Sequence, residues 1–164
     1  MPTTHIYFFD TSALLKLLIS EPGSEKAWNL FGQKRLCYTS WVLLGEALGV
    51  LKHKHQLNAL GRQDYCESVE LLFNLLRKRK LRTLDLASVD GQPELLTYNL
   101  DLQELLKKYP RLDAADLLQF AAIRQSYIRA TESLKLAILV TADKKLAKAA
   151  LSEGIESSLV NKDE

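Results

Sequence analysis

The stretch that decides the fold is IYFFDTSALLKLLI, residues 6–19. Its first four residues are aromatic or β-branched, which favours a short strand over residues 6–9. The apolar run 11–19 that follows is typical of a helix, and Glu21-Pro22-Gly23 would end that helix. Asp10 stands between the two segments, where a strand would pass into a helix. The stretch therefore predicts a strand and a helix with a carboxylate at their junction.

The same alternation of strand-like and helical segments continues along the chain, as in an α/β domain with a mainly parallel sheet. We expect further strands at 36–39, 82–86 and 137–140, and a weaker edge strand at 155–159. We expect helices at 25–33 after an N-cap at Ser24, and at 41–54, 61–78, 93–109, 113–126 and 144–153, where Gly154 ends the last one. The sequence has no repeat or linker, so we expect a single domain over residues 1–164.

The composition is that of an ordinary globular protein, with 47% apolar and 26% charged residues, and it excludes the disordered and fibrous classes. The N-terminus lacks the basic start of a secretory signal, and no apolar stretch reaches the roughly 18 residues of a membrane span. We therefore expect a cytoplasmic protein with no membrane partner. The two cysteines have neither the spacing of a metal site nor the density of a disulfide scaffold.

The net charge of +2 hides an uneven distribution of basic residues. Segment 77–82 is almost entirely basic, and it contributes Arg77, Lys78, Arg79, Lys80 and Arg82. Such a segment favours a polyanionic partner such as RNA. The alternative is a solvated helix end, where basic side chains suit the helix dipole. For 77–82 the two interpretations stand about even, whereas the second cluster, 52–55, is better explained as a helix end.

Four acidic residues lie in segments that are otherwise apolar. Asp10 follows the first strand, Glu46 lies within helix 41–54, Asp116 lies near the start of helix 113–126, and Asp143 follows strand 137–140. Burying an unpaired carboxylate is costly, so four in comparable contexts predict a shared cationic partner. Oxygen ligands without a pair of histidines or cysteines favour Mg²⁺ or Mn²⁺ over zinc.

Each acid also has a structural interpretation. Asp10, Asp113 and Asp143 stand where helix N-caps are expected, and Asp143 taken alone is slightly better explained as a cap. We assign Asp113 to capping, which leaves Asp116 facing the strand ends. Glu46 is the hardest to explain structurally, because its face of the helix is apolar. The coincidence of four such acids favours the functional interpretation.

With these residues in place, the chain resembles a PIN-domain nuclease, and most closely the VapC-like toxins of toxin–antitoxin pairs. The resemblance rests on residues 9–16 with 21–24, on 38–40 with Glu46, on 113–121 and on 139–150. It extends over nearly the whole chain. It implies a three-layer sandwich with a central, mainly parallel sheet of four or five strands flanked by helices.

The resemblance also implies an endoribonuclease that uses Mg²⁺ or Mn²⁺, forms a homodimer and is inhibited by a small antitoxin protein. We expect Asp10, Asp116 and Asp143 to hold one or two ions, while Glu46 binds the second ion or orients water. Hydroxyl groups would position the carboxylates or the substrate, namely those of Thr11, Ser12 and Thr141.

Two other functions stay open. One is a phosphatase that acts on small phosphate esters with Asp10 as nucleophile, although Ser12 stands where the haloacid-dehalogenase-like phosphatases carry a second aspartate. The other is a PIN-like module that binds RNA or a protein without turnover.

Overall fold

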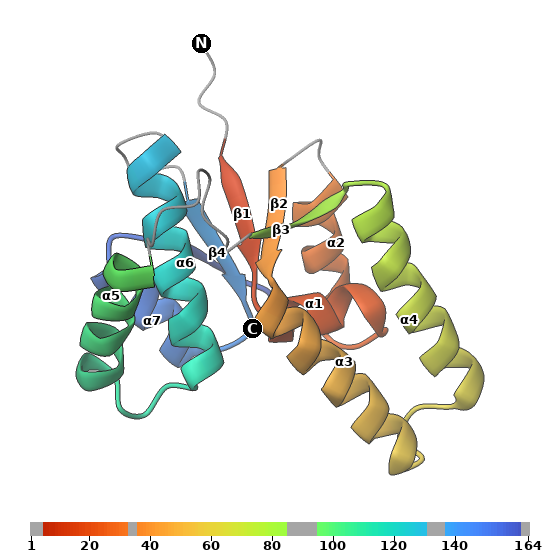
Figure 1. The fold of residues 1–164 in the computed structure, drawn as a ribbon. Helices are drawn as coiled ribbons and strands as arrows, with labels where there is room; N and C mark the ends of the chain where they lie inside the picture. The colour runs from red at the N-terminus through yellow and green to blue at the C-terminus, as the bar shows by residue number, and fades with distance from the viewer. Residues whose placement is uncertain (1–4, 33–35, 85–94, 131–136, 162–164) are drawn as a thin grey trace.

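Five parallel strands form a single sheet in a computed structural model, which describes residues 5–32, 36–84, 95–130 and 137–161 (Figure 1). Their order is β3-β2-β1-β4-β5. The strands are β1 (Ile6–Phe9), β2 (Leu36–Ser40), β3 (Leu81–Leu84), β4 (Ala137–Thr141) and β5 (Glu156–Leu159). The expected strands and the parallel sheet are confirmed. Residues 85 and 86, expected at the end of the third strand, lie outside the described residues.

Seven helices in the described part of the chain cover the two faces of the sheet. They are α1 (Thr11–Leu18), α2 (Ser24–Gly32), α3 (Trp41–Gln56), α4 (Arg62–Arg77), α5 (Leu95–Lys108), α6 (Ala114–Ala130) and α7 (Lys144–Ser152). Figure 1 shows α1 to α4 on one side and α5 to α7 on the other, so the expected three-layer sandwich is confirmed. Within these residues, no helix has both the length and the apolar character needed to cross a membrane. The expected helix residues 33, 93 and 94 lie outside the described residues.

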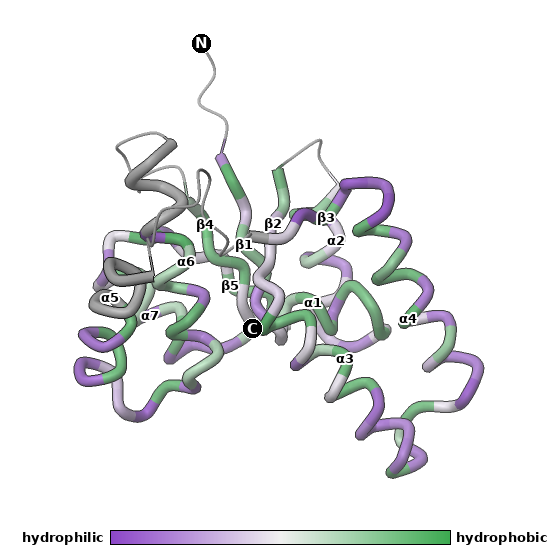
Figure 2. Tube along the Cα trace, viewed as in Figure 1, coloured by the Kyte–Doolittle hydropathy of each residue, from purple (hydrophilic) through white to green (hydrophobic). Residues whose placement is uncertain are grey.

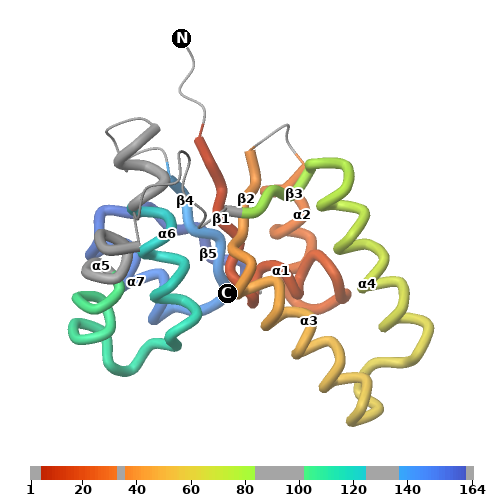
Figure 3. The backbone as a smooth tube through the Cα atoms, in the orientation of Figure 1, coloured from red at the N-terminus to blue at the C-terminus, as the bar shows by residue number. Residues whose placement is uncertain are grey.

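The strand order reverses beside β1. The chain builds β1, β2 and β3 outward in one direction and then returns to place β4 on the free side of β1. β1 and β4, red and blue in Figure 3, therefore run side by side although they are far apart in sequence. In open α/β sheets, ligands bind outside the carboxyl ends of the strands at such a reversal.

β1 is buried on both of its faces. Successive strand side chains point to opposite faces. Tyr7 and Phe9 pack into the core under α1 to α4, whereas Phe8 packs into the core under α5 to α7. A strand covered on both sides is apolar throughout, which explains why the sequence shows no alternation there. In Figure 2, hydrophobic and hydrophilic residues alternate along α4, as expected of a helix that packs by one side.

Three helices end in the same kind of turn. Residues Asn58, Arg79 and Gly154 adopt positive φ angles of 57°, 51° and 77° after α3, α4 and α7. The N–H group of the next residue then reaches back into the last turn, as Lys80 does to the carbonyl of Leu75 at 3.0 Å. The expected helix end at Gly154 is confirmed. Arg79 adopts this conformation without being glycine.

The expected N-cap at Ser24 is wrong. Ser24 is the first residue of α2, and its hydroxyl group serves the preceding turn instead. The Oγ atom accepts a hydrogen bond from the N–H of Glu21 and donates one to the carbonyl of Ile19, both at 3.0 Å. A serine hydroxyl can hydrogen-bond the backbone of a helix or that of the turn before it, and here it bonds the connection between α1 and α2.

Candidate active site

Asp10 lies at the junction of β1 and α1 and is almost fully buried, with 3% of its surface exposed. Its backbone N–H donates to the carbonyl of Val140 on β4 at 3.1 Å, which extends the pairing of the two strands. Its Oδ1 accepts from the N–H of Ala13 at 2.8 Å, so the side chain caps α1. Asp10 can therefore be both a helix cap and a residue of the candidate site, because the same carboxylate caps α1 and lies at the end of β1.

Two hydroxyl groups hold the Asp10 carboxylate. Ser12 Oγ donates to Asp10 at 2.8 Å from Oδ1 and 3.0 Å from Oδ2, and Thr141 Oγ1 donates to Oδ2 at 2.5 Å. Each hydroxyl is itself oriented by a backbone N–H: Ala142 donates to Ser12 Oγ at 2.8 Å, and Asp143 donates to Thr141 Oγ1 at 2.9 Å. Both hydroxyl protons are thereby directed toward Asp10. The network fixes the start of α1 against the loop after β4.

Burial and hydrogen bonds act in opposite directions on Asp10. Together these effects raise its pKa from 3.8 to about 6, and burial is the largest cause, because the charged form loses its hydration. The hydrogen bonds from Thr141, Ala13 and Ser12 lower the pKa, since they stabilise the charged form, and the nearby charge of Asp143 raises it slightly. Burial has the largest effect, so the carboxyl group gains protons far more readily than an exposed aspartate.

Glu46 lies on α3 and is linked to α1 through Thr11. The Thr11 hydroxyl donates a short hydrogen bond to Glu46 Oε2, and both side chains are partly buried. The helical neighbours Val42 and Gly49 are exposed, so this apolar face of α3 lies at the surface. Thr11 thereby ties Glu46 to the residue next to Asp10.

The pKa of Asp116, in the first turn of α6, depends on the charges of the other carboxylates. Its pKa is raised from 3.8 to about 7, first by burial and then by the negative charges of Asp10, Glu46, Asp113 and Asp143. Because Coulomb repulsion weakens with distance, these contributions indicate that acids from the ends of β1 and β4 and from α3 and α6 gather at one edge of the sheet. This edge is the one at which the strand order reverses.

The four acids differ in burial, which corrects one expectation. We expected all four to be buried, but only Asp10 is; Glu46 and Asp116 are partly exposed and Asp143 is exposed. Asp143 caps α7, with Oδ1 accepting from the N–H of Lys145 at 2.7 Å. Asp10 directly follows the last residue of β1, whereas Asp143 stands two residues beyond the end of β4, outside the sheet.

Asp113 is a capping residue, as its position in the sequence suggests. It is exposed, and its Oδ1 accepts from the N–H of Ala115 at 3.1 Å at the start of α6. Its charge still contributes to the raised pKa of Asp116. The structure thus separates the two aspartates of this segment, one at the helix cap and one toward the other acids.

The donors at this edge suit a hard divalent cation, although they are not gathered into a coordination shell. Among the residues that the structure describes, no three His, Cys, Asp or Glu side chains are placed to hold one metal ion. Mg²⁺ is commonly held by one or two carboxylates and keeps several waters, so it does not need three protein ligands. Two like charges about 4 Å apart repel by roughly 4 kcal/mol at an effective dielectric near 20, which opposes closer approach of bare carboxylates. The carboxylate oxygens of Asp10, Glu46, Asp116 and Asp143 and the hydroxyl oxygen of Thr11 fit Mg²⁺ or Mn²⁺ in kind.

The basic run 77–82 does not form one surface. Lys78 and Lys80 line a hollow of about 490 Å³ between α2 and α4, whereas Arg79 and Arg82 line a different hollow beside β3. Between them, Leu81 is buried in the core. Arg77 donates from its Nη2 to Asn74 Oδ1 at 2.8 Å. The turn at Arg79 therefore divides charges that are contiguous in sequence.

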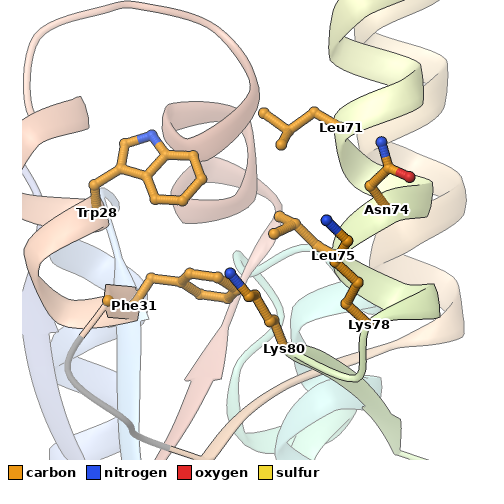
Figure 4. Close-up of a pocket in the computed structure, with 8 residues that line it drawn as sticks. Trp28, Phe31, Leu71, Asn74, Leu75, Lys78 and Lys80 are labelled. Atoms are coloured by element: carbon orange, nitrogen blue, oxygen red, sulfur yellow. The ribbon is translucent and has the colours of Figure 1, made fainter.

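The hollow between α2 and α4 has an apolar wall and a basic rim, and we call it the Trp28 groove (Figure 4). Trp28 and Phe31 project from α2 toward Leu71 and Leu75 of α4, and the two rings meet edge to face at 5.7 Å between centroids. Its lining residues are Trp28, Phe31, Gly32, Leu71, Asn74, Leu75, Lys78 and Lys80. Trp28 remains 38% exposed in this groove.

Sequence reasoning missed the role of Lys16. This lysine is buried in α1, and its Nζ donates to the carbonyl of Pro22 at 2.6 Å and to Glu21 Oε1 at 3.3 Å. The following Gly23 has φ +91°, and a Cβ there would stand 1.9 Å from the carbonyl oxygen of Val160. The turn after α1 is thereby pressed against the end of β5. A lysine inside an apolar helix, five residues before a glutamate, is the signal in the sequence.

The comparisons with known proteins bear on the fold. No protein-family model matches the sequence, and no curated protein sequence matches it. Similar solved structures include VapBC2 from Rickettsia felis bound to a promoter DNA fragment, with a TM-score of 0.57, 15% identity, and coverage of 94% of this chain and 98% of that chain. PAE2754 from Pyrobaculum aerophilum has a TM-score of 0.54 and 18% identity, with 93% and 89% covered.

VapBC-1 from nontypeable Haemophilus influenzae is similar at a TM-score of 0.55 and 16% identity, with 94% of this chain and 98% of that chain covered. At these identities the likeness is one of fold, and it extends over almost the entire chain. The expected resemblance is confirmed at that level: this chain has the PIN-like α/β fold, with a parallel sheet of order β3-β2-β1-β4-β5.

Proposed function

We propose that the protein is a metal-dependent endoribonuclease that cleaves RNA phosphodiester bonds, and that it is the toxin of a toxin–antitoxin pair. One observation carries the nuclease proposal: hydrogen bonds from Thr11 and Thr141 bring Glu46, Asp10 and the end of β4 together at the edge where the strand order reverses. The pKa of Asp116, raised by burial and by the charges of these acids, agrees with this arrangement. A cluster of like charges at such an edge is unfavourable without a cation, and phosphodiester hydrolysis is a reaction that bound divalent cations promote. The PIN-like fold shared with VapBC structures supports it.

In this proposal Asp10, Asp116 and Asp143 hold one or two ions, and Glu46 binds the second ion or orients the attacking water. Bound Mg²⁺ or Mn²⁺ supplies charge neutralisation at the phosphate and lowers the pKa of a bound water. The hydroxyl of Thr11 keeps the Glu46 carboxylate beside α1, so that it can accept a proton from the attacking water. Ser12 and Thr141 keep both oxygens of Asp10 in a fixed direction.

The phosphatase alternative fits the geometry less well. An aspartate nucleophile needs an oxygen that can attack phosphorus. Both oxygens of Asp10 accept hydrogen bonds, Oδ1 from Ala13 and Ser12 and Oδ2 from Thr141 and Ser12, and the side chain is 3% exposed. Such a carboxylate is better suited to act as a fixed ligand than as a nucleophile.

Cleavage of single-stranded RNA with and without Mg²⁺ tests this function. We expect Asp10→Asn to abolish cleavage, and EDTA to do the same for the unaltered protein. The matched control is Asp64→Asn, which neutralises an exposed acid in the first turn of α4. Unchanged cleavage by Asp10→Asn would remove Asp10 from the mechanism. Turnover of a chromogenic phosphate ester in place of RNA would favour the phosphatase, and RNA binding without turnover would favour the binding module.

We also propose a small antitoxin protein as partner, because two of the similar structures are described as VapBC. The Trp28 groove suits an amphipathic segment of such a partner, since its apolar wall is rimmed by Lys78 and Lys80 and would accept apolar and acidic side chains together. The product of a short neighbouring reading frame should inhibit RNA cleavage, and Trp28→Ala should weaken that inhibition. Inhibition that Trp28→Ala leaves unchanged would place the partner elsewhere. The expected homodimer stays a prediction, which light scattering of the purified protein tests.

A further inference from the structure

A second hollow of about 450 Å³ lies beside the edge strand β3, and we call it the Trp41 hollow. It is formed by the start of α3, the end of α4 and β3. Its lining residues are Trp41, Leu76, Arg79, Leu81, Arg82 and Thr83. Among the residues that the structure describes, the lining is therefore aromatic, apolar and cationic, without an acidic side chain.

Trp41 is the unusual member of this lining. It is 58% exposed, although an indole ring is among the most favourable groups to bury. It is the first residue of α3, and the Oγ of Ser40 caps that helix by accepting from the N–H of Leu43 at 3.3 Å. The ring is thus carried by a capped helix end rather than by a loose loop. An exposed aromatic ring held in this way is a ready surface for stacking.

The fold fixes the backbone of one arginine of the hollow and the side chain of the other. Arg79 occupies the left-handed turn that ends α4, with φ 51°. The guanidinium of Arg82 lies 6.0 Å from the centroid of the Tyr38 ring, and its Nη1 donates to the Tyr38 hydroxyl at 3.5 Å. Guanidinium groups present several N–H donors in a plane and match phosphate oxygens well. Positive charge and a stacking ring therefore meet in one hollow.

The hollow lies near the proposed catalytic edge. β1 and β2 pair with Phe8 beside Tyr38, so Asp10 and Ser40 stand level at the ends of these adjacent strands. Adjacent strands are roughly 5 Å apart, and Trp41 follows Ser40 directly. A polymer that reaches Asp10 can therefore reach Trp41 within a short length.

We propose that the Trp41 hollow binds one unpaired nucleotide of the RNA substrate, with its base stacked on the indole ring and its phosphate held by Arg79 and Arg82. The inference deepens the proposed nuclease function and rests on it for the choice of RNA as the polymer. A paired base cannot present its face to Trp41, so the hollow selects single-stranded over duplex RNA. The hollow thereby supplies a substrate contact that the acidic edge lacks.

Fluorescence tests this contact directly, because the chain has only two tryptophans, Trp28 and Trp41. Trp28→Phe leaves Trp41 as the sole indole reporter. A short single-stranded RNA, added in EDTA so that no metal-dependent cleavage occurs, should quench this fluorescence. The same sequence paired with its complement should quench it far less. Absence of quenching at RNA concentrations that saturate binding in a filter assay would overturn the inference.

Affinity measurements with matched variants give the magnitude of the contribution that the Trp41 hollow makes to RNA binding. Trp41→Ala should weaken binding of single-stranded RNA by about 5- to 150-fold, the range expected for loss of one stacked base. Trp41→Phe should keep most of the affinity, and Phe73→Ala, the control for loss of an exposed aromatic ring on α4, should change it less than twofold. Arg82→Gln should reduce the slope of log affinity against log salt by about 0.7. Its control is Arg62→Gln, which changes an exposed arginine at the start of α4.

Two further results would overturn the inference. One is equal RNA affinity of Trp41→Ala and the unaltered protein when both show the same circular dichroism. The other is a change of oligomeric state in Trp41→Ala without a change in RNA affinity, which would make the hollow an interface between copies of this chain. Failure of the nuclease proposal is distinguishable, because it would leave binding at Trp41 intact while RNA stays uncleaved in Mg²⁺. Conversely, cleavage with an unchanged KM in Trp41→Ala would remove only the hollow.

Discussion

Replacing Asp10 by Asn should stabilise the protein while it abolishes activity. The Asp10 carboxylate is 3% exposed, and burial raises its pKa from 3.8 to about 6. A difference of about 2 pKa units between folded and unfolded states corresponds to about 3 kcal/mol of unfolding free energy. Because the folded state binds the proton more tightly, stability falls as the pH rises from about 4 to about 6. Above that range the unaltered protein carries the whole penalty, and the Asn variant carries none.

The side-chain contacts of Asn reduce this gain only in part. The Asn carbonyl can take the place of Oδ1 and still accept from the N–H of Ala13. The Asn amide group takes the place of Oδ2, where Thr141 now donates, so the Thr141 hydroxyl must turn and accept instead. Losing one such hydrogen bond costs about 1 kcal/mol. We therefore expect a net gain of about 2 kcal/mol at pH 8 and a net loss of about 1 kcal/mol below pH 4, where only the lost hydrogen bond remains.

Urea unfolding at pH 4, 6 and 8 in EDTA measures this difference. The variant should gain stability relative to the unaltered protein as the pH rises, and the two free energies of unfolding should become equal between about pH 4 and 5. In millimolar Mg²⁺ at pH 8 the stability advantage of the variant should become smaller or change sign. The reason is that only the unaltered protein gains the full free energy of metal binding. Asp64→Asn, an exposed control on α4, should show no such trend between pH 5 and 8. A variant that is less stable than the unaltered protein at pH 8 in EDTA would refute the reasoning.

Three further predictions concern the site and its supporting turn. Millimolar Mg²⁺ should raise the melting temperature more at pH 8 than at pH 6, because Asp116, with a pKa of about 7, must lose its proton to bind a cation; an equal shift at both values would contradict this. Thr141→Val should raise the pKa of Asp10 above about 6 in a carboxyl-carbon NMR titration, since it removes a hydrogen bond to the charged form, and an unchanged value would contradict the contact. Gly23→Ala should lower the unfolding free energy by more than about 2 kcal/mol, because a Cβ would overlap the Val160 carbonyl. Gly49→Ala, in open space on α3, should raise the unfolding free energy by up to about 1 kcal/mol. Equal urea midpoints of the two variants would contradict this packing.

Part of the fold follows from contacts that are local in sequence. The four apolar residues of β1 and the acid after them predict a buried strand that passes into a capped helix, and the structure has both. Gly154 marks the end of α7, because the turn it forms closes within six residues. Ser24 shows the limit of such reasoning, since its hydroxyl could serve either the helix or the preceding turn.

The candidate site depends on contacts that the sequence does not contain. Residue types alone suggested Asp10, Glu46, Asp116 and Asp143, but not that Asp10 alone is buried. The hydrogen bond from Thr11 to Glu46 joins residues 35 positions apart. The pKa of Asp116 depends on burial and on charges that other elements bring near it. These quantities depend on distances through space, which a pattern in the local sequence does not contain.

By itself, the sequence determined where strands and helices form and which acids stand at their junctions, because hydrophobic periodicity, caps and terminating turns act over a few residues. Only the tertiary structure decided how those acids share one edge of the sheet, and how the basic run divides between the Trp28 groove and the Trp41 hollow. Strand order places β1 beside β4, and the turn at Arg79 separates adjacent side chains. Burial and Coulomb energy follow from that arrangement, because both depend on which groups are neighbours in space.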